Sequence, residues 1–574
     1  MVLSYQAKEK KKPIIILSSS HNQPEVFDDD KKLPCAVHDY NQTKYGVDVI
    51  DQCIGNYTVR RINRRWPMVN QDIELNDIPT NIGEQQCIDS NKISSHEKCN
   101  SIKNWWHKAT KIFACLNVEE RGIERISSED RTDVTIINTA MIWVSANIII
   151  PCFAAGTLGP AVFELDLNNS FVTIIIFNLL GILPIAGMAY FGPASGLRTM
   201  IFSRYSWGYY AVNGITGAQT LRVVFNDSFP ITVGIIIIAI ITMIVSFIGY
   251  KWIHIYERYS WIPVFIGYCI LAGVGAKYFT NSKMVFHNAT ISNNSRTFRL
   301  ELSRILTFGS VIFGTACSWC PLAADYNTYF PESTSQQKIF LLTYISNFVS
   351  ITVMQLLGVA AYTGTHTNQN WKQAYEINNV GGLLGAILSP LRGFGKFILI
   401  LFAISTVVCN IPNLYSLSLS AQVIAPILSR IPRFLYTVIG TVAYVLLAIV
   451  AASKFNDALT SVMGISSYWS AIFMVIVFED HLLFRCCSFP NYNFSIWNSS
   501  KLLPISLAAI LSAIVGVAGI ILGMSQIWFS GPIAKVIAEN TDIEGTDIGF
   551  EVGLIFTAVT FPLFRLIELY FIRR

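Results

Sequence analysis

Apolar residues are concentrated in long blocks, and nearly all of these blocks lie after residue 133. The first 133 residues are polar and charged, without an apolar run of more than a few residues. Each later block is close to the roughly 20 residues that cross a bilayer as a helix. The pattern predicts an all-α polytopic membrane protein with eleven clear spans, at residues 134–157, 171–191, 231–250, 259–279, 305–324, 338–362, 394–425, 434–453, 458–478, 503–527 and 548–571.

A twelfth span is predicted over Trp207 to Phe225, although this segment contains three glycines and Arg222. With twelve spans, the basic loops after spans 4, 8 and 10 lie on the same side as the basic N-terminal flank and Arg573-Arg574. The positive-inside rule makes that side the cytosol, with both termini there. The glycosylation sequons at Asn288 and Asn293 then lie outside.

Composition narrows the class of protein. Hydrophobic residues make up 52% of the chain and charged residues 14%, whereas an ordinary soluble protein has about 25% charged residues. A soluble enzyme is therefore excluded. The net charge of +5 gives no argument for nucleic-acid binding. The twelve cysteines lack the spacing of a zinc site, so we expect no metal centre and no cofactor.

Helix-breaking and polar residues interrupt the first and the sixth of the twelve spans. Asn147 is followed by Pro151 and Cys152, and Pro321 is followed by Asp325. Such breaks free backbone carbonyls that can bind a substrate or a cation, and their separation by five spans indicates an inverted five-plus-five repeat. Asn147 and Asp325 are candidates for coupling to a cation. The alternatives are a kinked packing helix and an acid solvated at the membrane interface.

The eighth span places two amides around a proline, at Asn410, Pro412 and Asn413. An amide has both a donor and an acceptor, which suits the edge of a heteroaromatic base. Trp319 in the sixth span offers an aromatic face to a planar ligand. The alternatives are amides that tie helices together and a tryptophan that only packs.

Residues from about Asn104 to the C-terminus resemble the fungal purine-cytosine permease family of nucleobase:cation symporters. The resemblance depends on ordered strings that include Trp143-Val-Ser-Ala-Asn147, Gly196-Leu-Arg-Thr-Met200, Tyr256-Glu-Arg-Tyr-Ser-Trp-Ile-Pro263, Ala323-Ala-Asp-Tyr326 and Asn410-Ile-Pro-Asn413. It implies twelve helices with a LeuT-like five-plus-five repeat, and uptake of cytosine, purines or a related heterocycle with a proton or possibly sodium.

The resemblance also implies a binding site between helices 3 and 6, with help from helices 1 and 8. Trp319 matches the aromatic residue of helix 6, Asn213 the amide of helix 3, and Asn410, Pro412 and Asn413 the helix 8 motif. Three positions depart from the family: Cys152 replaces a serine, Tyr209 a tryptophan and Cys409 an asparagine.

Helix 3 is shortened relative to the family. Between Tyr205 and Gly208 the chain lacks about 17 residues that the family has, or roughly 25 Å of helix. Either helix 3 spans poorly or the gene model has lost an exon.

The N-terminal head, residues 1–69, resembles a different family. Residues 8–69 are similar to the end of a piggyBac-type transposase catalytic domain, in which Asp48 corresponds to the third metal-binding carboxylate. One carboxylate cannot clamp the two metal ions of strand transfer, and the other two acidic positions are absent. We therefore expect residues 1–69 to be a mostly disordered vestige without functional nucleic-acid binding, followed by a linker at 70–103 and a cytosolic pre-helix segment at 104–133.

These observations predict a secondary active transporter, not an enzyme, whose permease domain covers residues 134–574. Its partners are the lipid bilayer and a small heterocyclic substrate, and the family resemblance indicates the plasma membrane. The alternative is a degraded, non-transporting paralogue or a chimeric gene product. The cargo, the coupling ion and the oligomeric state are not determined by the sequence.

Overall fold

A computed structural model describes residues 2–5, 14–17, 122–209, 239–240, 242–243, 250–279, 294–424, 427–431, 433–451 and 455–572. The chain divides into two compact units, residues 1–99 and 100–574. In the first unit, β1 (Val2–Tyr5) pairs antiparallel with β2 (Ile14–Leu17), with Val2 opposite Leu17. Asp48 and most of the predicted transposase-like segment lie outside the described residues.

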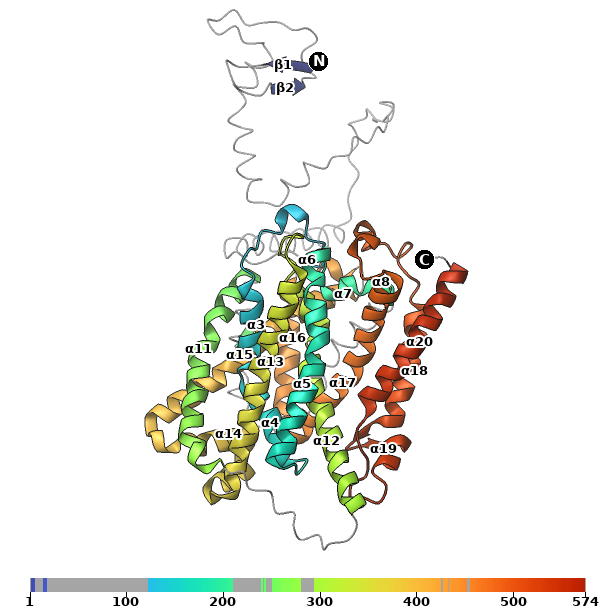
Figure 1. Ribbon diagram of the computed structural model, residues 1–574. Helices are drawn as coiled ribbons and strands as arrows, with labels where there is room; N and C mark the ends of the chain where they lie inside the picture. Colours follow the sequence, from blue (N-terminus) through green and yellow to red (C-terminus); the bar gives the residue numbers. More distant parts are fainter. Residues whose placement is uncertain are drawn as a thin grey trace, which may run out of the picture. The chain divides into compact units, whose positions relative to one another are not determined.

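The second unit is a bundle of helices (Figure 1). The longer described helices are α3 (Ile137–Asn147), α4 (Ile150–Ala161), α5 (Leu167–Ala189), α11 (Tyr250–Gly275), α12 (Asn294–Cys317), α13 (Gln336–Thr363), α14 (Gln369–Leu388), α15 (Arg392–Val423), α16 (Arg433–Ala451), α17 (Phe455–Glu479), α18 (Leu507–Gly523) and α20 (Gly549–Ile572). Short elements join them: α6 (Phe191–Ser195), α7 (Thr199–Phe202), α8 (Arg204–Trp207), 3-10 helix η5 (Cys320–Tyr326), hairpin β3 (Ser525–Gln526) with β4 (Phe529–Ser530), and α19 (Pro532–Ile537).

The first predicted span is broken, as the sequence indicated. Helices α3 and α4 meet at an angle of 53°. Ile148 and Ile149 between them have non-helical backbone angles, and Pro151 occupies the first turn of α4. Proline is tolerated there because the first amides of a helix have no intrahelical partner.

The sixth span is also interrupted, but its two parts are not bent as sharply as α3 and α4. Helix α12 ends at Cys317, and 3-10 helix η5 begins at Cys320 with Pro321 in its first turn. In the described part of the chain, the first and sixth spans are thus both interrupted, each with a proline at the start of its second half. This matches the pairing expected of the inverted repeat.

Small residues allow the helices at the centre of the second unit to approach closely. A Cβ atom added to Gly156 of α4 would lie 2.0 Å from the backbone oxygen of Gln355 in α13. One added to Gly358 of α13 would lie 2.1 Å from the oxygen of Phe153 in α4. The two backbones thus touch in a crossing that only glycine allows, an arrangement frequent between membrane helices.

The apolar helices fit a membrane protein. Among the described residues, seven helical segments are long and apolar enough to cross a bilayer, and the bent α3–α4 pair makes an eighth. Many large apolar side chains on their outer faces are exposed, such as Leu180, Val349 and Leu563, as expected where lipid is the solvent. Most of the predicted spans at Trp207–Phe225 and 231–250 lies outside the described residues, so the total of twelve stays a prediction.

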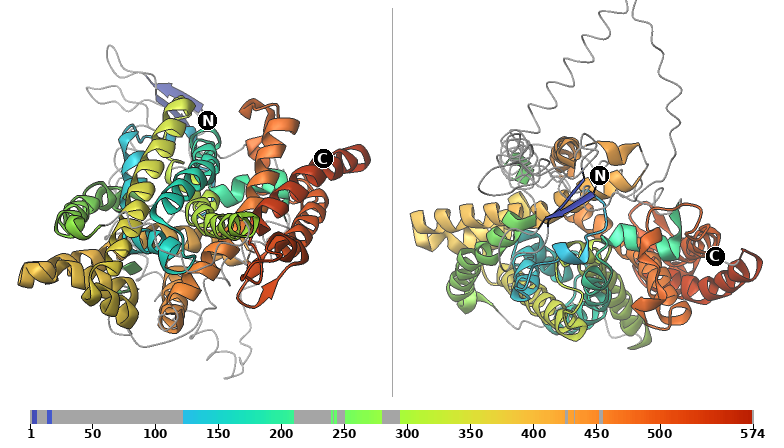
Figure 2. Two further views of the ribbon diagram at one scale, coloured as in Figure 1. Left: turned by 60° about the horizontal axis from the view of Figure 1, so that its bottom comes forward. Right: turned by 90° about the horizontal axis from the view of Figure 1, so that it is seen from above.

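Helix α14 was not predicted from the sequence. It bends at Asn378 and Asn379, whose backbone angles are not helical. In the views of Figure 2, α14 and the start of α15 (gold) lie at the edge of the second unit. Polar residues occur in most turns of α14, so its hydropathy is too low to predict a span.

Candidate functional site

A cavity of about 420 Å³ lies beside the two helix breaks. The first break contributes Ile149, Pro151 and Cys152, and the second contributes Trp319 and Pro321. Helices α15 and α17 form the remaining walls. Its complete lining is Ala146, Ile149, Pro151, Cys152, Thr315, Ser318, Trp319, Pro321, Leu322, Cys409, Asn410, Asn413, Leu417, Ser420, Leu459, Val462, Met463, Ser466, Trp469 and Ser470.

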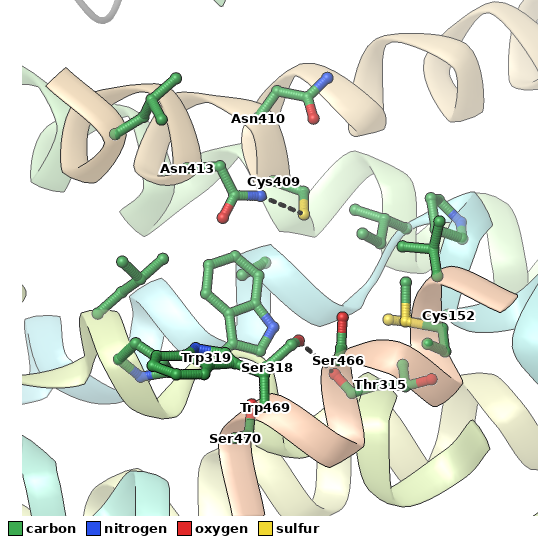
Figure 3. A pocket seen from close by; sticks show the side chains of 18 of the residues that line it. Cys152, Thr315, Ser318, Trp319, Cys409, Asn410, Asn413, Ser466, Trp469 and Ser470 are labelled. Carbon is green, nitrogen blue, oxygen red and sulfur yellow. Dashed lines mark hydrogen bonds between the residues drawn. The ribbon is translucent and has the colours of Figure 1, made fainter. Parts of the chain in front are cut away.

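Four of the residues predicted to bind the substrate line this cavity: Cys152, Trp319, Asn410 and Asn413. They come from α4, the second helix break and α15, which are far apart in the chain. Figure 3 shows Asn413 and Cys409 on one side of the cavity and the tryptophans on the other. The Asn413 amide donates to the Cys409 sulfur at 3.8 Å, from one turn further along α15.

The Trp319 ring is held by a second tryptophan. Trp143 of α3 packs edge-on against it with ring centroids 5.8 Å apart, and also against Tyr326 at 5.9 Å. Trp319 is 8% exposed and Trp143 is 1% exposed. The Tyr326 hydroxyl in turn lies 3.0 Å from the hydroxyl of Ser416 in α15. Aromatic packing therefore fixes the orientation of the indole that faces the cavity.

The cavity combines apolar walls with a few polar groups. Hydroxyls are supplied by Thr315, Ser318, Ser466 and Ser470, and amides by Asn410 and Asn413. A cavity of this size and lining is typical of a small-molecule site. Flat aromatic faces with amides beside them can hold a planar heterocycle by stacking and by hydrogen bonds to its edge.

The two residues predicted to couple to a cation do not line the cavity. Asn147, at the end of α3, donates to Asn347 Oδ1 at 3.0 Å and to Ser350 Oγ at 3.1 Å, so it ties α3 to α13. Asp325 is buried in η5, and its Oδ1 accepts from the backbone amide of Thr199 at 2.8 Å. Their roles in coupling stay predictions.

The remaining predicted site residues lie elsewhere or outside the described part. Pro412 is buried within α15 and is not part of the lining. The Tyr209 ring lies 4.5 Å from the guanidinium carbon of Arg204 instead of in the cavity. Burial lowers the pKa of Arg204 to about 10. Asn213 lies outside the described residues.

The wall formed by α17 was not predicted from the sequence. Ser466, Trp469 and Ser470 project into the cavity from this helix. They recur at positions i, i+3 and i+4, which lie on one face of a helix. A hydroxyl-and-tryptophan stripe inside an apolar span was the signal that could have identified them.

Comparison with known families gives one match that covers most of the chain. Residues 125–536 match the family model described as permease for cytosine/purines, uracil, thiamine, allantoin. Purine-cytosine permease fcyB of Emericella nidulans is 38% identical over 485 residues, covering 81% of this chain and 92% of the relative. Purine-cytosine permease FCY21 of Saccharomyces cerevisiae is 33% identical, covering 87% and 97%.

More distantly related proteins also align with most of this chain. The vitamin B6 transporter TPN1 of Saccharomyces cerevisiae is 27% identical, covering 80% of this chain and 89% of the relative. Among solved structures, Mhp1, a nucleobase-cation-symport-1 family transporter in a closed conformation with bromovinylhydantoin bound, aligns with a TM-score of 0.50 at 12% identity. That alignment covers 79% of this chain and 95% of Mhp1.

Proposed function

Because the chain belongs to the family of permeases for cytosine/purines, uracil, thiamine and allantoin, we propose that it imports a nucleobase such as cytosine or a purine, or a related small heterocycle, together with a proton. Family membership makes the chain a multi-pass membrane transporter and not an enzyme. The observation that carries the choice of cargo is the aromatic and amide-lined cavity between the two broken helices.

In this proposal the heterocycle stacks on Trp319, and the side chains of Asn410 and Asn413 form hydrogen bonds with the polar groups at its edge. The location of these three side chains around one cavity supports the assignment. Cys152 and Cys409 also face the cavity, and thiols are weaker hydrogen-bond partners than the family's serine and asparagine. The substrate preference of this chain is therefore expected to differ in detail from that of its relatives.

Tyr209, Asn213 and Pro412 complete the proposed binding set by family resemblance. We further infer coupling to a proton rather than sodium, with Asn147 and Asp325 as candidate coupling residues. The basic loops favour cytosolic termini, and the family resemblance favours the plasma membrane.

The test is uptake of radiolabelled cytosine and adenine by cells that lack their own nucleobase permeases. Unlabelled cytosine, adenine, hypoxanthine, uracil and pyridoxine are added as competitors, since a relative of this chain is a vitamin B6 transporter. Saturable uptake suppressed by one of these heterocycles is the expected result. Uptake no higher than in vector-only cells, with the protein present at the surface, would instead identify a non-transporting paralogue.

The matched variant Trp319→Ala removes the proposed stacking face. Uptake should fall by about 5- to 140-fold, because stacking a base on an aromatic ring is worth about 1–3 kcal/mol. Trp319→Phe, which keeps a ring, should retain most of it. Unchanged uptake by Trp319→Ala at equal surface abundance would refute the stacking role.

A further inference from the structure

Glu257 is a fully buried carboxyl group in the first half of α11. Its exposed fraction is 0%. Neither Oε1 nor Oε2 has a hydrogen-bond partner among the residues that the structure describes. The neighbouring Arg258 does not neutralise it by direct contact, since its guanidinium donates instead to Asn138 Oδ1 of α3, from Nε at 3.0 Å.

The groups around Glu257 belong to the helices that form the candidate site. If it were ionised, Glu257 would act electrostatically on the thiol of Cys409 in α15, which lines the cavity, and on the hydroxyl of Tyr326, which follows the break in the sixth span. On its own helix it would act on the adjacent Tyr256. Helix α11 packs against α15 and α3, and among the described residues Arg258 is the nearest cation along α11.

Among the described residues, an ionised carboxylate in this place would have no counter-ion, and its burial keeps it from water. Burial without a partner strongly disfavours the charged form, so the group takes up a proton when no ion pair is available. Acids that face the interior of a membrane bundle are typical proton relays. The other two candidates differ, because the Asn147 amide cannot bind a proton at physiological pH and the Asp325 carboxylate accepts a backbone hydrogen bond.

We propose that Glu257 binds the co-transported proton, an inference that rests on the proposed function as a proton symporter. The carboxylate takes a proton from outside water when the pathway is open to that side, and the neutral acid stays buried in α11 while the cavity holds the substrate. When the pathway opens to the cytosol, water reaches the acid, the O–H bond breaks and the proton leaves with the cargo. One proton enters and one leaves in each cycle.

Glu257→Gln tests this directly, because glutamine has the shape of the protonated acid but cannot release a proton. In the variant, exchange of labelled for unlabelled nucleobase across the membrane should persist. Net uptake should lose its dependence on external pH and on a protonophore, and accumulation inside the cell should fall by about tenfold or more, to the external concentration. Accumulation by Glu257→Gln with the wild-type pH dependence would overturn the inference.

Glu551→Gln is the matched control. Glu551 Oε2 is also buried without a described partner, and neither acid lines the cavity, but Glu257 interacts with the lining residue Cys409 whereas Glu551 interacts with Asp547, outside the lining. This variant should therefore keep proton-driven accumulation. If Glu257→Gln does not reach the surface, Glu257→Asp replaces it: moving the carboxyl group should shift the pH midpoint of uptake, and an unshifted midpoint would overturn the inference. Wild-type uptake driven by sodium and independent of pH would do the same. Absence of any wild-type uptake would instead refute the proposed function.

Discussion

Trp469 shows what a single side chain is expected to contribute to the cavity. It lies on α17, across from Asn413, and lines the same space as Trp319. Replacing Trp469 with alanine should raise the KM for nucleobase uptake by about 5- to 140-fold, since a lost stacking contact costs about 1–3 kcal/mol and each 1.4 kcal/mol is a factor of ten. Initial rates over a substrate series measure this. Trp528→Ala, a change at a tryptophan that is exposed and outside the lining, should leave KM unchanged. An equal effect of both variants would contradict the assignment.

Asp547, just before α20, gives the fold a pH-dependent contribution to stability. Its carboxylate accepts from Gln526 Nε2 at 2.8 Å, from the Gly549 amide at 3.0 Å and from the Tyr468 hydroxyl. Burial nevertheless raises its pKa from 3.8 to about 6. Since the folded-state pKa is raised, the contribution is complete below the unfolded pKa and is lost as the pH rises through about 6, a change equivalent to about 3 kcal/mol.

Asp547→Asn should therefore flatten the pH dependence of thermal unfolding. Between about pH 4 and pH 7, the unfolding temperature of the detergent-purified variant should fall less than that of the wild type. Asp457→Asn at an exposed position serves as the control and should keep the wild-type slope. If Asp547→Asn also keeps that slope, the carboxyl group does not titrate in this range.

At the scale of elements, the crossing of α4 and α13 requires glycine at two positions, Gly156 and Gly358. A methyl group at Gly358 would lie 2.1 Å from the Phe153 oxygen, so the two backbones must separate to accommodate it. Gly358→Ala should lower the free energy of unfolding by about 1–3 kcal/mol, as overpacking does elsewhere. A lower unfolding temperature and less surface protein should follow. Gly273→Ala in α11, where a Cβ meets nothing within 4 Å, should change neither. Comparable losses in both variants would point to helix propensity instead of the crossing.

The helix breaks show how far the sequence alone could predict these elements. Pro151 and Pro321 indicated that the first and sixth spans are interrupted, because proline removes an amide donor and cannot continue a helix from the preceding turn. The exact point of each break was not predictable. The first break falls at Ile148 and Ile149, two residues with no local tendency to end a helix, so the packing around them must fix it.

The candidate site could be predicted only in part for a similar reason. Trp319, Asn410 and Asn413 carry local signals, namely an indole and amides in apolar spans. Ser466 and Ser470 carry a weak signal, because isolated serines in membrane helices often bond to their own backbone. Glu257 lies just before the predicted span at 259–279, where an acid is expected at the membrane interface. Only the packing of α11 shows that its side chain is fully buried.

At the scale of the whole molecule, we expect a deletion confined to the first unit to be tolerated and one that extends into the second unit to be harmful. Residues 100–574 form a compact unit by themselves, and the family match begins at residue 125. Removing residues 1–99 should leave the KM for uptake within about twofold of the full chain, a difference well under 1 kcal/mol. Uptake kinetics normalised to surface protein measure this. A large loss would mean that the head takes part in transport.

The matched deletion extends through residue 131 and should abolish folding. Arg131 Nη1 donates to the Pro193 carbonyl at 2.7 Å, Arg125 Nε to the Ser195 carbonyl at 2.8 Å, and the Ile126 amide to Gly196 at 2.9 Å. These contacts hold the segment before α3 against the turn that follows α6. Arg131 is 3% exposed, so removing it leaves buried carbonyls without donors, at about 1–3 kcal/mol each. Surface protein should therefore disappear in the longer deletion and persist in the shorter one, and persistence in both would show that this segment is dispensable.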